Sequence, residues 1–158
     1  MRTTLISLLI CSALAGLAAC GDDSSEQLSA EELVSRADEI CRGGIGRFDE
    51  IQPRPPSNAA EAEAQTAALL EVASDELNDL RELRPPDELR EPYDAYLASR
   101  GRALDQLERG REAAANRDTD AYAAAQTRVT ADQASRIKLA RAVGLQDCSE
   151  APDTPEAG

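Results

Sequence analysis

The sequence predicts an all-α fold, an antiparallel four-helix bundle with up-down-up-down connections that follows a flexible N-terminal tether. The 158 residues are rich in Ala, Leu, Glu and Arg, which favour helices, and they include one Phe, three Tyr and no Trp. No window alternates β-branched and polar residues as strands do. Apolar residues instead recur at steps of three and four in four segments, which are separated by short polar or proline-rich breaks.

The first helix is expected to begin at Ser29, because Ser29 and Glu32 have the spacing of a capping box. Its apolar stripe consists of Leu33, Ala37, Ile40, Gly44, Phe48 and Ile51. Glycines weaken a helix relative to alanine, so they either let another helix approach closely or mark a bend, and we favour close approach. The glycines concerned are Gly43, Gly44 and Gly46. The proline-rich segment 52–56 must end this helix.

The second helix is expected from an N-cap at Ser57 to about Leu83. Its apolar stripe consists of Thr66, Leu70, Ala73, Leu77 and Leu80, with Leu69 beside it. Another proline-rich break follows. Proline deep inside a helix clashes with an earlier carbonyl group. We therefore predict a separate single turn over residues 88–91 and place Pro92 in the first turn of a third helix, which continues to about Asn116.

The fourth helix is expected to begin after an N-cap at Asp118 and to end near Val143. Gly144 then suits the left-handed conformation that often follows the last residue of a helix. Four amphipathic helices with short connections favour an antiparallel bundle. The helical domain is thus predicted to span residues 29–148, and the polar, proline-containing residues 149–158 are expected to be disordered.

The N-terminal segment has the layout of a secretory signal, with Arg2 before an apolar run that is shorter than the roughly 20 residues needed to span a bilayer. The run ends in Leu17-Ala18-Ala19-Cys20, and polar residues follow at once. This pattern resembles the lipobox of bacterial lipoproteins. The resemblance implies removal of residues 1–19, attachment of a diacylglycerol to the sulfur of Cys20, and a flexible tether over residues 20–28. The alternative is a chance cysteine after an ordinary export signal.

A lipid anchor would hold the protein at the outer face of the cell membrane, since two or three acyl chains give stable binding that one chain does not. The formal net charge is −13, and it becomes −14 when Arg2 leaves with residues 1–19. Such a charge argues against nucleic acid as a partner, because nucleic-acid binding requires clustered cations. It also argues against electrostatic docking on anionic lipid, so the acyl chains alone would hold the protein to the membrane.

Cys41 and Cys148 are the two cysteines that remain once Cys11 leaves with the signal and Cys20 carries lipid. An even pair of cysteines in an oxidising compartment predicts a disulfide. In an up-down-up-down bundle the start of the first helix and the end of the fourth share one end, where the two cysteines could meet. The alternative is a redox or metal site, but the sequence has no CxxC spacing, and it has no histidine to complete such a site.

No set of residues in the sequence indicates catalysis. The chain has no histidine and no glycine-rich phosphate loop of the usual pattern, so we expect no enzymatic activity, no cofactor and no metal. Arg100, Arg111 and Arg136 take positions in apolar stripes where leucine would be expected. Either each arginine lays its stem along the core and carries its guanidinium to water or to a helix carboxylate, or the three form a polar pocket for an anionic ligand.

Segments 37–41, 83–86 and 142–148 resemble small helical lipoproteins of high-GC Gram-positive bacteria. This resemblance implies no particular activity. The lipobox, the acidic charge and the missing catalytic residue types together lead us to expect a binding or scaffolding role at the cell envelope, with an envelope protein or a wall polymer as partner. The alternative is a receptor for a small anionic ligand that binds to the three arginines.

Overall fold

The computed structural model describes residues 27–150 as four long helices and one short 3₁₀ helix. The elements are α1 (Ala30–Ile51), α2 (Ala59–Glu82), α3 (Asp87–Ala115), α4 (Thr119–Val143) and η1 (Asp147–Ser149). The predicted signal peptide, the predicted lipidation site at Cys20 and residues 151–158 of the predicted tail lie outside the described residues.

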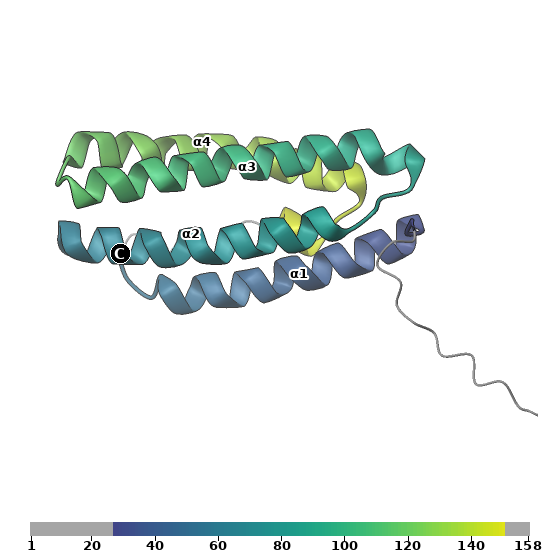
Figure 1. Ribbon diagram of the computed structural model, residues 1–158, viewed down its shortest axis with the longest axis horizontal. Helices are drawn as coiled ribbons and strands as arrows, with labels where there is room; N and C mark the ends of the chain where they lie inside the picture. Colours follow the sequence, from purple (N-terminus) through teal and green to yellow (C-terminus); the bar gives the residue numbers. More distant parts are fainter. Residues whose placement is uncertain (1–26, 151–158) are drawn as a thin grey trace, which may run out of the picture.

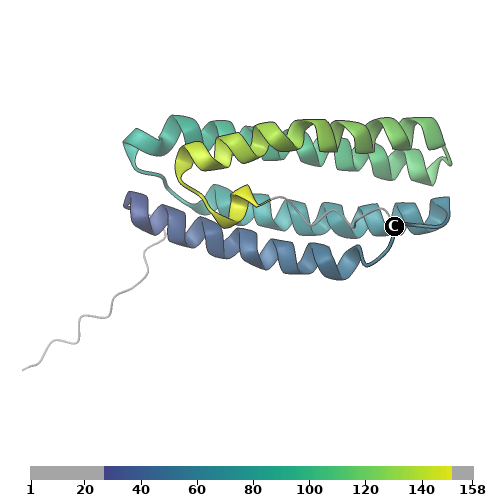
Figure 2. The same ribbon diagram turned by 180° about the vertical axis from the view of Figure 1, so that it is seen from behind.

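The four helices run antiparallel, and each contacts its neighbour in the sequence, α1 with α2, α2 with α3 and α3 with α4 (Figure 1). This arrangement confirms the predicted four-helix bundle. After α4 the chain turns back, and η1 packs against both α1 and α4. The views from the two sides agree that η1, drawn in yellow, lies between these helices, beside the middle of α1 (Figures 1 and 2).

The helix ends show why local sequence signals predicted most of the boundaries. Ser29 and Glu32 form the complete capping box, with the Ser29 N–H donating to Glu32 Oε2 over 2.9 Å and the Glu32 N–H donating to Ser29 Oγ over 3.3 Å. Asp118 accepts the N–H of Ala121 at 2.9 Å and caps α4 as predicted. Gly144 follows α4 with φ of 97°, the left-handed conformation expected there.

The N-cap of α2 differs from the prediction by one residue. Asn58, not Ser57, is the cap, because Asn58 Oδ1 accepts the N–H of Glu61 at 3.0 Å. Ser57 stands one position earlier and donates its N–H and its hydroxyl to the Glu61 carboxylate, over 2.8 and 2.7 Å. Both side chains thus bond to the first turn, and the residue adjacent to the helix takes the capping position.

The prediction of a separate turn before Pro92 was wrong. α3 begins at Asp87 and continues without a break through Pro92. A proline there removes one backbone hydrogen bond, the one that its missing N–H would make to the residue four positions earlier. The packing of this end of α3 offsets that loss, because Tyr93 and Tyr96 are fully buried and the Tyr93 hydroxyl donates to the carbonyl oxygen of Leu80 over 2.7 Å.

One cluster of buried hydrophobic residues lies in the half of the bundle where α1 begins and α4 ends. Its buried members are Leu33, Ala37, Cys41, Leu80, Tyr93, Tyr96, Ala140, Val143 and Leu145. Leu28 packs against this cluster and its N–H donates to the Arg84 carbonyl oxygen over 2.9 Å, while Ser149 is buried in η1. Leu28 and Ser149, which adjoin the predicted domain of residues 29–148, are therefore packed against the bundle. Within residues 27–150 we find no helix that combines the length and the apolar character of a membrane span.

Candidate functional site

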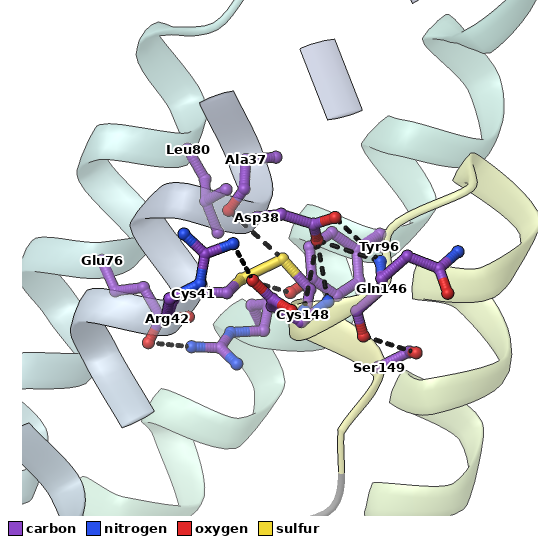
Figure 3. Close-up of a disulfide and its surroundings, with 12 residues drawn as sticks. Ala37, Asp38, Cys41, Arg42, Glu76, Leu80, Tyr96, Gln146, Cys148 and Ser149 are labelled. Carbon is purple, nitrogen blue, oxygen red and sulfur yellow. Dashed lines mark hydrogen bonds and ion pairs between the residues drawn. A yellow bond between two sulfur atoms is a disulfide. The ribbon is translucent and has the colours of Figure 1, made fainter. Parts of the chain in front are cut away.

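A disulfide joins α1 to the segment that follows α4. The sulfur atoms of Cys41 and Cys148 are 2.03 Å apart and the two Cα atoms 5.1 Å apart, across 107 residues of sequence (Figure 3). The bond connects the middle of α1 to η1, because the chain folds back along α1 after the end of α4. The predicted disulfide is confirmed.

The side chain of Asp38, one turn before Cys41 on α1, binds the backbone of the same segment. Its Oδ1 accepts the N–H groups of Gln146 and Asp147, each at 3.0 Å, and that of Cys148 at 3.4 Å. Its Oδ2 also lies 3.0 Å from the Gln146 nitrogen. Asp38 is only 7% exposed. These contacts cap the start of η1 with a buried carboxylate (Figure 3).

Arg42 completes the contact between α1 and η1, with its Nη2 atom 2.5 Å from Asp147 Oδ2. We call the three α1 residues Asp38, Cys41 and Arg42, together with residues 146–148, the C-terminal clamp. The i, i+3, i+4 spacing of the α1 residues places them on one helix face. Sequence reasoning identified the cysteine but missed Asp38 and Arg42, because their partners lie more than 100 residues away.

A second group of polar residues crosses the interior of the bundle. Glu76 on α2 is 2% exposed, and its Oε2 lies 2.5 Å from Arg100 Nη2 on α3. The contact is a close ion pair that lacks the alignment of a hydrogen bond. Burial raises the pKa of the Glu76 carboxyl, and the charge of Arg100 opposes that rise. We call Glu76, Arg100, Arg136 and Gly44 the polar layer, since each helix contributes one member.

Gly44 supplies the space on α1 that this layer requires. A Cβ atom at Gly44 would lie 2.7 Å from Glu76 Oε2, closer than real Cβ contacts come. A Cβ at Gly43 or Gly46 would meet nothing among the described residues within 4 Å. The predicted close approach is therefore found at Gly44, and the atom that approaches is a carboxylate oxygen, not the backbone of a helix. Close approach does not explain why glycine stands at positions 43 and 46.

Arg136 on α4 is hydrogen-bonded to the backbone of its own helix. Its Nη2 donates to the carbonyl oxygen of Val129 over 3.2 Å, and its Nη1 is buried with no acceptor among the described residues. Burial lowers the pKa of the Arg136 guanidinium, and the nearby charge of Arg100 lowers it further. Two of the three predicted arginines are thus close enough to affect each other, and one of them carries an unused donor.

Arg111 does not belong to this layer. It lies eleven residues after Arg100 on α3, which corresponds to about 16 Å along the helix axis. Its Nε and Nη2 donate to the Glu108 carboxylate over 3.1 and 2.6 Å, and these bonds raise the pKa of the Arg111 guanidinium. The structure therefore does not bring together the predicted pocket of three arginines, because Arg111 pairs with a carboxylate on its own helix.

The connection between α2 and α3 carries an open pocket of about 430 Å³. Its lining residues are Gln27, Leu83, Arg84, Pro85, Asp87, Arg90 and Asp94. The Gln27 amide donates to Asp87 Oδ1 and to the Pro85 carbonyl oxygen, over 3.1 and 3.2 Å, and Arg90 forms an ion pair with Asp87. These polar groups bind one another, so the pocket offers no convergent set of donors or acceptors.

Nowhere in residues 27–150 do three or more side chains of the metal-binding types gather as a metal site would require.

In comparisons with known proteins, the chain matches no family model, no curated protein and no solved structure. The C-terminal clamp and the polar layer are the two candidate sites of the described residues.

Proposed function

We propose that this chain is a lipid-anchored, extracytoplasmic module that binds a partner or acts as a scaffold at the cell envelope. The Cys41–Cys148 disulfide carries the proposal, because such bonds form and persist in oxidising compartments and are rare in the reducing cytoplasm. The sequence Leu17-Ala18-Ala19-Cys20, which resembles a lipobox, supports the same location independently. Anchoring through acyl chains at Cys20 would then hold the helical domain outside the cell membrane.

A binding role is supported by the way the buried charged groups are used. Asp38 is bonded to the backbone of η1, and Glu76 is paired with Arg100, so both carboxylates hold parts of the fold together. A general acid or base must instead reach a substrate proton. The sequence also lacks histidine, the side chain most often used for that purpose.

The geometry of the bundle supports one orientation of the domain on the membrane. Seven residue steps separate Cys20 from Gln27, a reach of roughly 25 Å at most. Leu28 bonds to Arg84 in the α2–α3 connection, so that end of the bundle would lie next to the membrane. The 29 residues of α3 span about 43 Å. The connections at 52–58 and 116–118 would therefore face outward, where an envelope protein or wall polymer could bind.

The anchor can be tested by fractionating cells that produce the full chain. Wild-type protein should remain with the membrane after a high-salt wash, because acyl chains and not charges hold it there. Cys20→Ala should move the domain to the soluble fraction or leave it unprocessed. Cys11→Ala is the matched control, since it removes a cysteine of the predicted signal that carries no lipid. Equal membrane retention of processed Cys20→Ala and wild type would refute the anchor.

A second candidate function, a receptor for a small anionic ligand, is favoured by one observation. The Nη1 atom of Arg136 is buried without an acceptor among the described residues. The guanidinium of Arg100 is near enough for its charge to lower the pKa of Arg136. A carboxylate or phosphate could accept from both groups, because guanidinium forks suit such oxygens. Arg111 is not part of this proposed receptor site.

Calorimetric titration of the full chain in detergent with succinate and with inorganic phosphate tests the receptor. Saturable binding that Arg136→Gln abolishes and Arg111→Gln preserves would support it. Arg111→Gln is the matched control because it removes an equal charge from the same bundle at a separate position. Absence of saturable binding to either probe, or equal loss in both variants, would count against the site.

A further inference from the structure

The hydrogen bonds of Asp38 do not involve the sulfur atoms of the disulfide beside them. Among the described residues its carboxylate binds backbone N–H groups of residues 146–148, and these groups exist whether Cys148 is a thiol or part of a disulfide. Hydrogen bonds to a buried charged acceptor are among the strongest in proteins. Asp38 can therefore hold the segment against α1 before Cys41 and Cys148 are joined.

The same contacts fix the position of Cys148 relative to Cys41. Asp38 and Cys41 lie one turn apart on α1, so the backbone that Asp38 binds places Cys148 beside Cys41, with 5.1 Å between the Cα atoms. That separation lies within the range that a disulfide can bridge. The Cys148 sulfur is also 3.4 Å from the carbonyl oxygen of Ala37, so a thiol at this position would have a hydrogen-bond acceptor.

Cys41 has a nearer competitor along the chain. Cys20 is 21 residues away, whereas Cys148 is 107 residues away. In an unfolded chain the shorter loop closes at a lower entropic cost, so an unguided Cys41 would pair with Cys20 more readily before lipid attaches to it. Formation of the long-range bond therefore requires a contact that brings the distant segment to α1 first.

We propose that Asp38 is a positioning residue that selects Cys148 as the partner of Cys41 and holds the two thiols together before oxidation. With a low-molecular-weight disulfide such as glutathione disulfide as oxidant, one cysteine thiolate attacks a sulfur of the oxidant and releases one glutathione. The second thiolate attacks the resulting mixed disulfide and releases the other. Two electrons pass to the oxidant and the two thiol protons are transferred to the two glutathiones released. This proposal depends on the disulfide and stands whether or not Cys20 carries lipid.

Equilibration with glutathione tests the proposal through the effective concentration of the two thiols. We would use the full chain with Cys11→Ala and Cys20→Ala, in detergent, and quantify the oxidised fraction across a series of glutathione ratios. Asp38→Asn should lower the effective concentration of Cys41 and Cys148 about tenfold or more, since the charged acceptor of three N–H groups is lost. Glu39→Gln is the matched control, because it neutralises the adjacent exposed carboxyl on the same helix. Equal values for Asp38→Asn and Glu39→Gln would overturn the proposal.

Restoring Cys20 in the same chain adds a test of selection. With Cys11→Ala alone, oxidation should yield the Cys41–Cys148 bond, whereas adding Asp38→Asn should produce a measurable fraction of Cys20–Cys41 pairing by peptide mass mapping. The same distribution of bonds in the presence and absence of Asp38 would contradict the selective role.

Amide hydrogen exchange in a chain that cannot form the bond separates positioning from general stability. In Cys41→Ser/Cys148→Ser the N–H groups of Gln146 and Asp147 should remain protected, and adding Asp38→Asn should reduce their protection about tenfold or more while amides of α4 stay protected. Loss of protection at both amides in the double serine variant would overturn the proposal. So would unfolding of that variant, because either result would show that the bond holds the segment and Asp38 does not.

Discussion

Gly44 on α1 leaves the space that the carboxylate of Glu76 on α2 occupies, since a Cβ at Gly44 would lie 2.7 Å from Glu76 Oε2. This relationship connects a glycine that weakens its own helix to an ion pair inside the bundle. Glu76 is the flexible partner, but its carboxylate is buried and lies 2.5 Å from Arg100 Nη2. Movement of the carboxylate away from an added methyl group would weaken that contact.

Substitution of Gly44 and Gly43 by alanine should therefore have opposite effects. Gly43→Ala should raise the free energy of unfolding by up to about 1 kcal/mol, because alanine favours the helix and meets nothing nearby. Gly44→Ala should lower it by about 1 kcal/mol, because displacing Glu76 weakens a buried ion pair. Urea denaturation of the two variants measures the difference. A stabilising effect of Gly44→Ala as large as that of Gly43→Ala would contradict this view of the polar layer.

Removing the charge of Arg100 should be strongly destabilising. Arg100→Gln leaves the Glu76 carboxylate buried without its cation, and breaking such a pair costs about 3 kcal/mol or more. Arg111→Gln serves as the control, because Arg111 pairs with Glu108 at the surface and its loss should leave stability nearly unchanged. Thermal and urea denaturation of both variants give the comparison, and similar losses in the two would argue against a special role for the interior pair.

The raised pKa of Glu76 predicts a specific dependence of stability on pH. An acid whose pKa is higher in the folded state than in the unfolded chain stabilises the fold most when it is protonated. The contribution of Glu76 to the free energy of unfolding is therefore complete below its ordinary pKa of 4.5, and it is lost as the pH rises through the raised pKa. The free energy of unfolding of wild type minus that of Glu76→Gln should therefore decrease as the pH rises above 4.5. Urea titrations across this range measure the slope. An increasing difference would show that Arg100 outweighs burial and lowers the pKa of Glu76.

Loss of the disulfide should lower stability without removing the helices. Cys41→Ser/Cys148→Ser frees a loop of 107 residues, for which the chain-entropy model gives up to about 4.7 kcal/mol. The melting temperature should fall well below that of wild type, while the helical circular dichroism signal at low temperature should persist. The reason is that α1, α2 and α4 retain their side-chain N-caps and the bundle retains its buried residues. An unchanged melting temperature would contradict a stabilising role for the bond.

The sequence predicted the features of the fold that depend on neighbouring residues. The capping box at Ser29, the cap at Asp118 and the left-handed Gly144 were correct, because each is set by groups within a few residues. The prediction for Pro92 failed for the opposite reason. The rule that excludes proline from a helix is local, whereas the burial of Tyr93 and its bond to Leu80 on another helix are tertiary effects that outweigh it.

The candidate sites were predictable only in part. The cysteine pair could be found because cysteines are few and an even pair favours a disulfide when the chain is expected to be exported. Asp38 could not, because it resembles any exposed helix carboxylate until its partners at 146–148 are known. Arg100 and Arg136 stood out as charges in apolar stripes, but the same reasoning selected Arg111, whose partner Glu108 lies one turn away. It also passed over Glu76, the buried carboxylate that pairs with Arg100.

The intact mass of wild-type protein extracted from membranes tests the proposed role most directly. An anchored module should lack residues 1–19 and carry a diacylglycerol on Cys20. After peptide mapping it should show Cys41 joined to Cys148. One sample thus reports on removal of the signal, attachment of the lipid and oxidation of the cysteine pair. A chain that retains residues 1–19 with an unmodified Cys20, and with both Cys41 and Cys148 as free thiols, would contradict the proposed extracytoplasmic, lipid-anchored role.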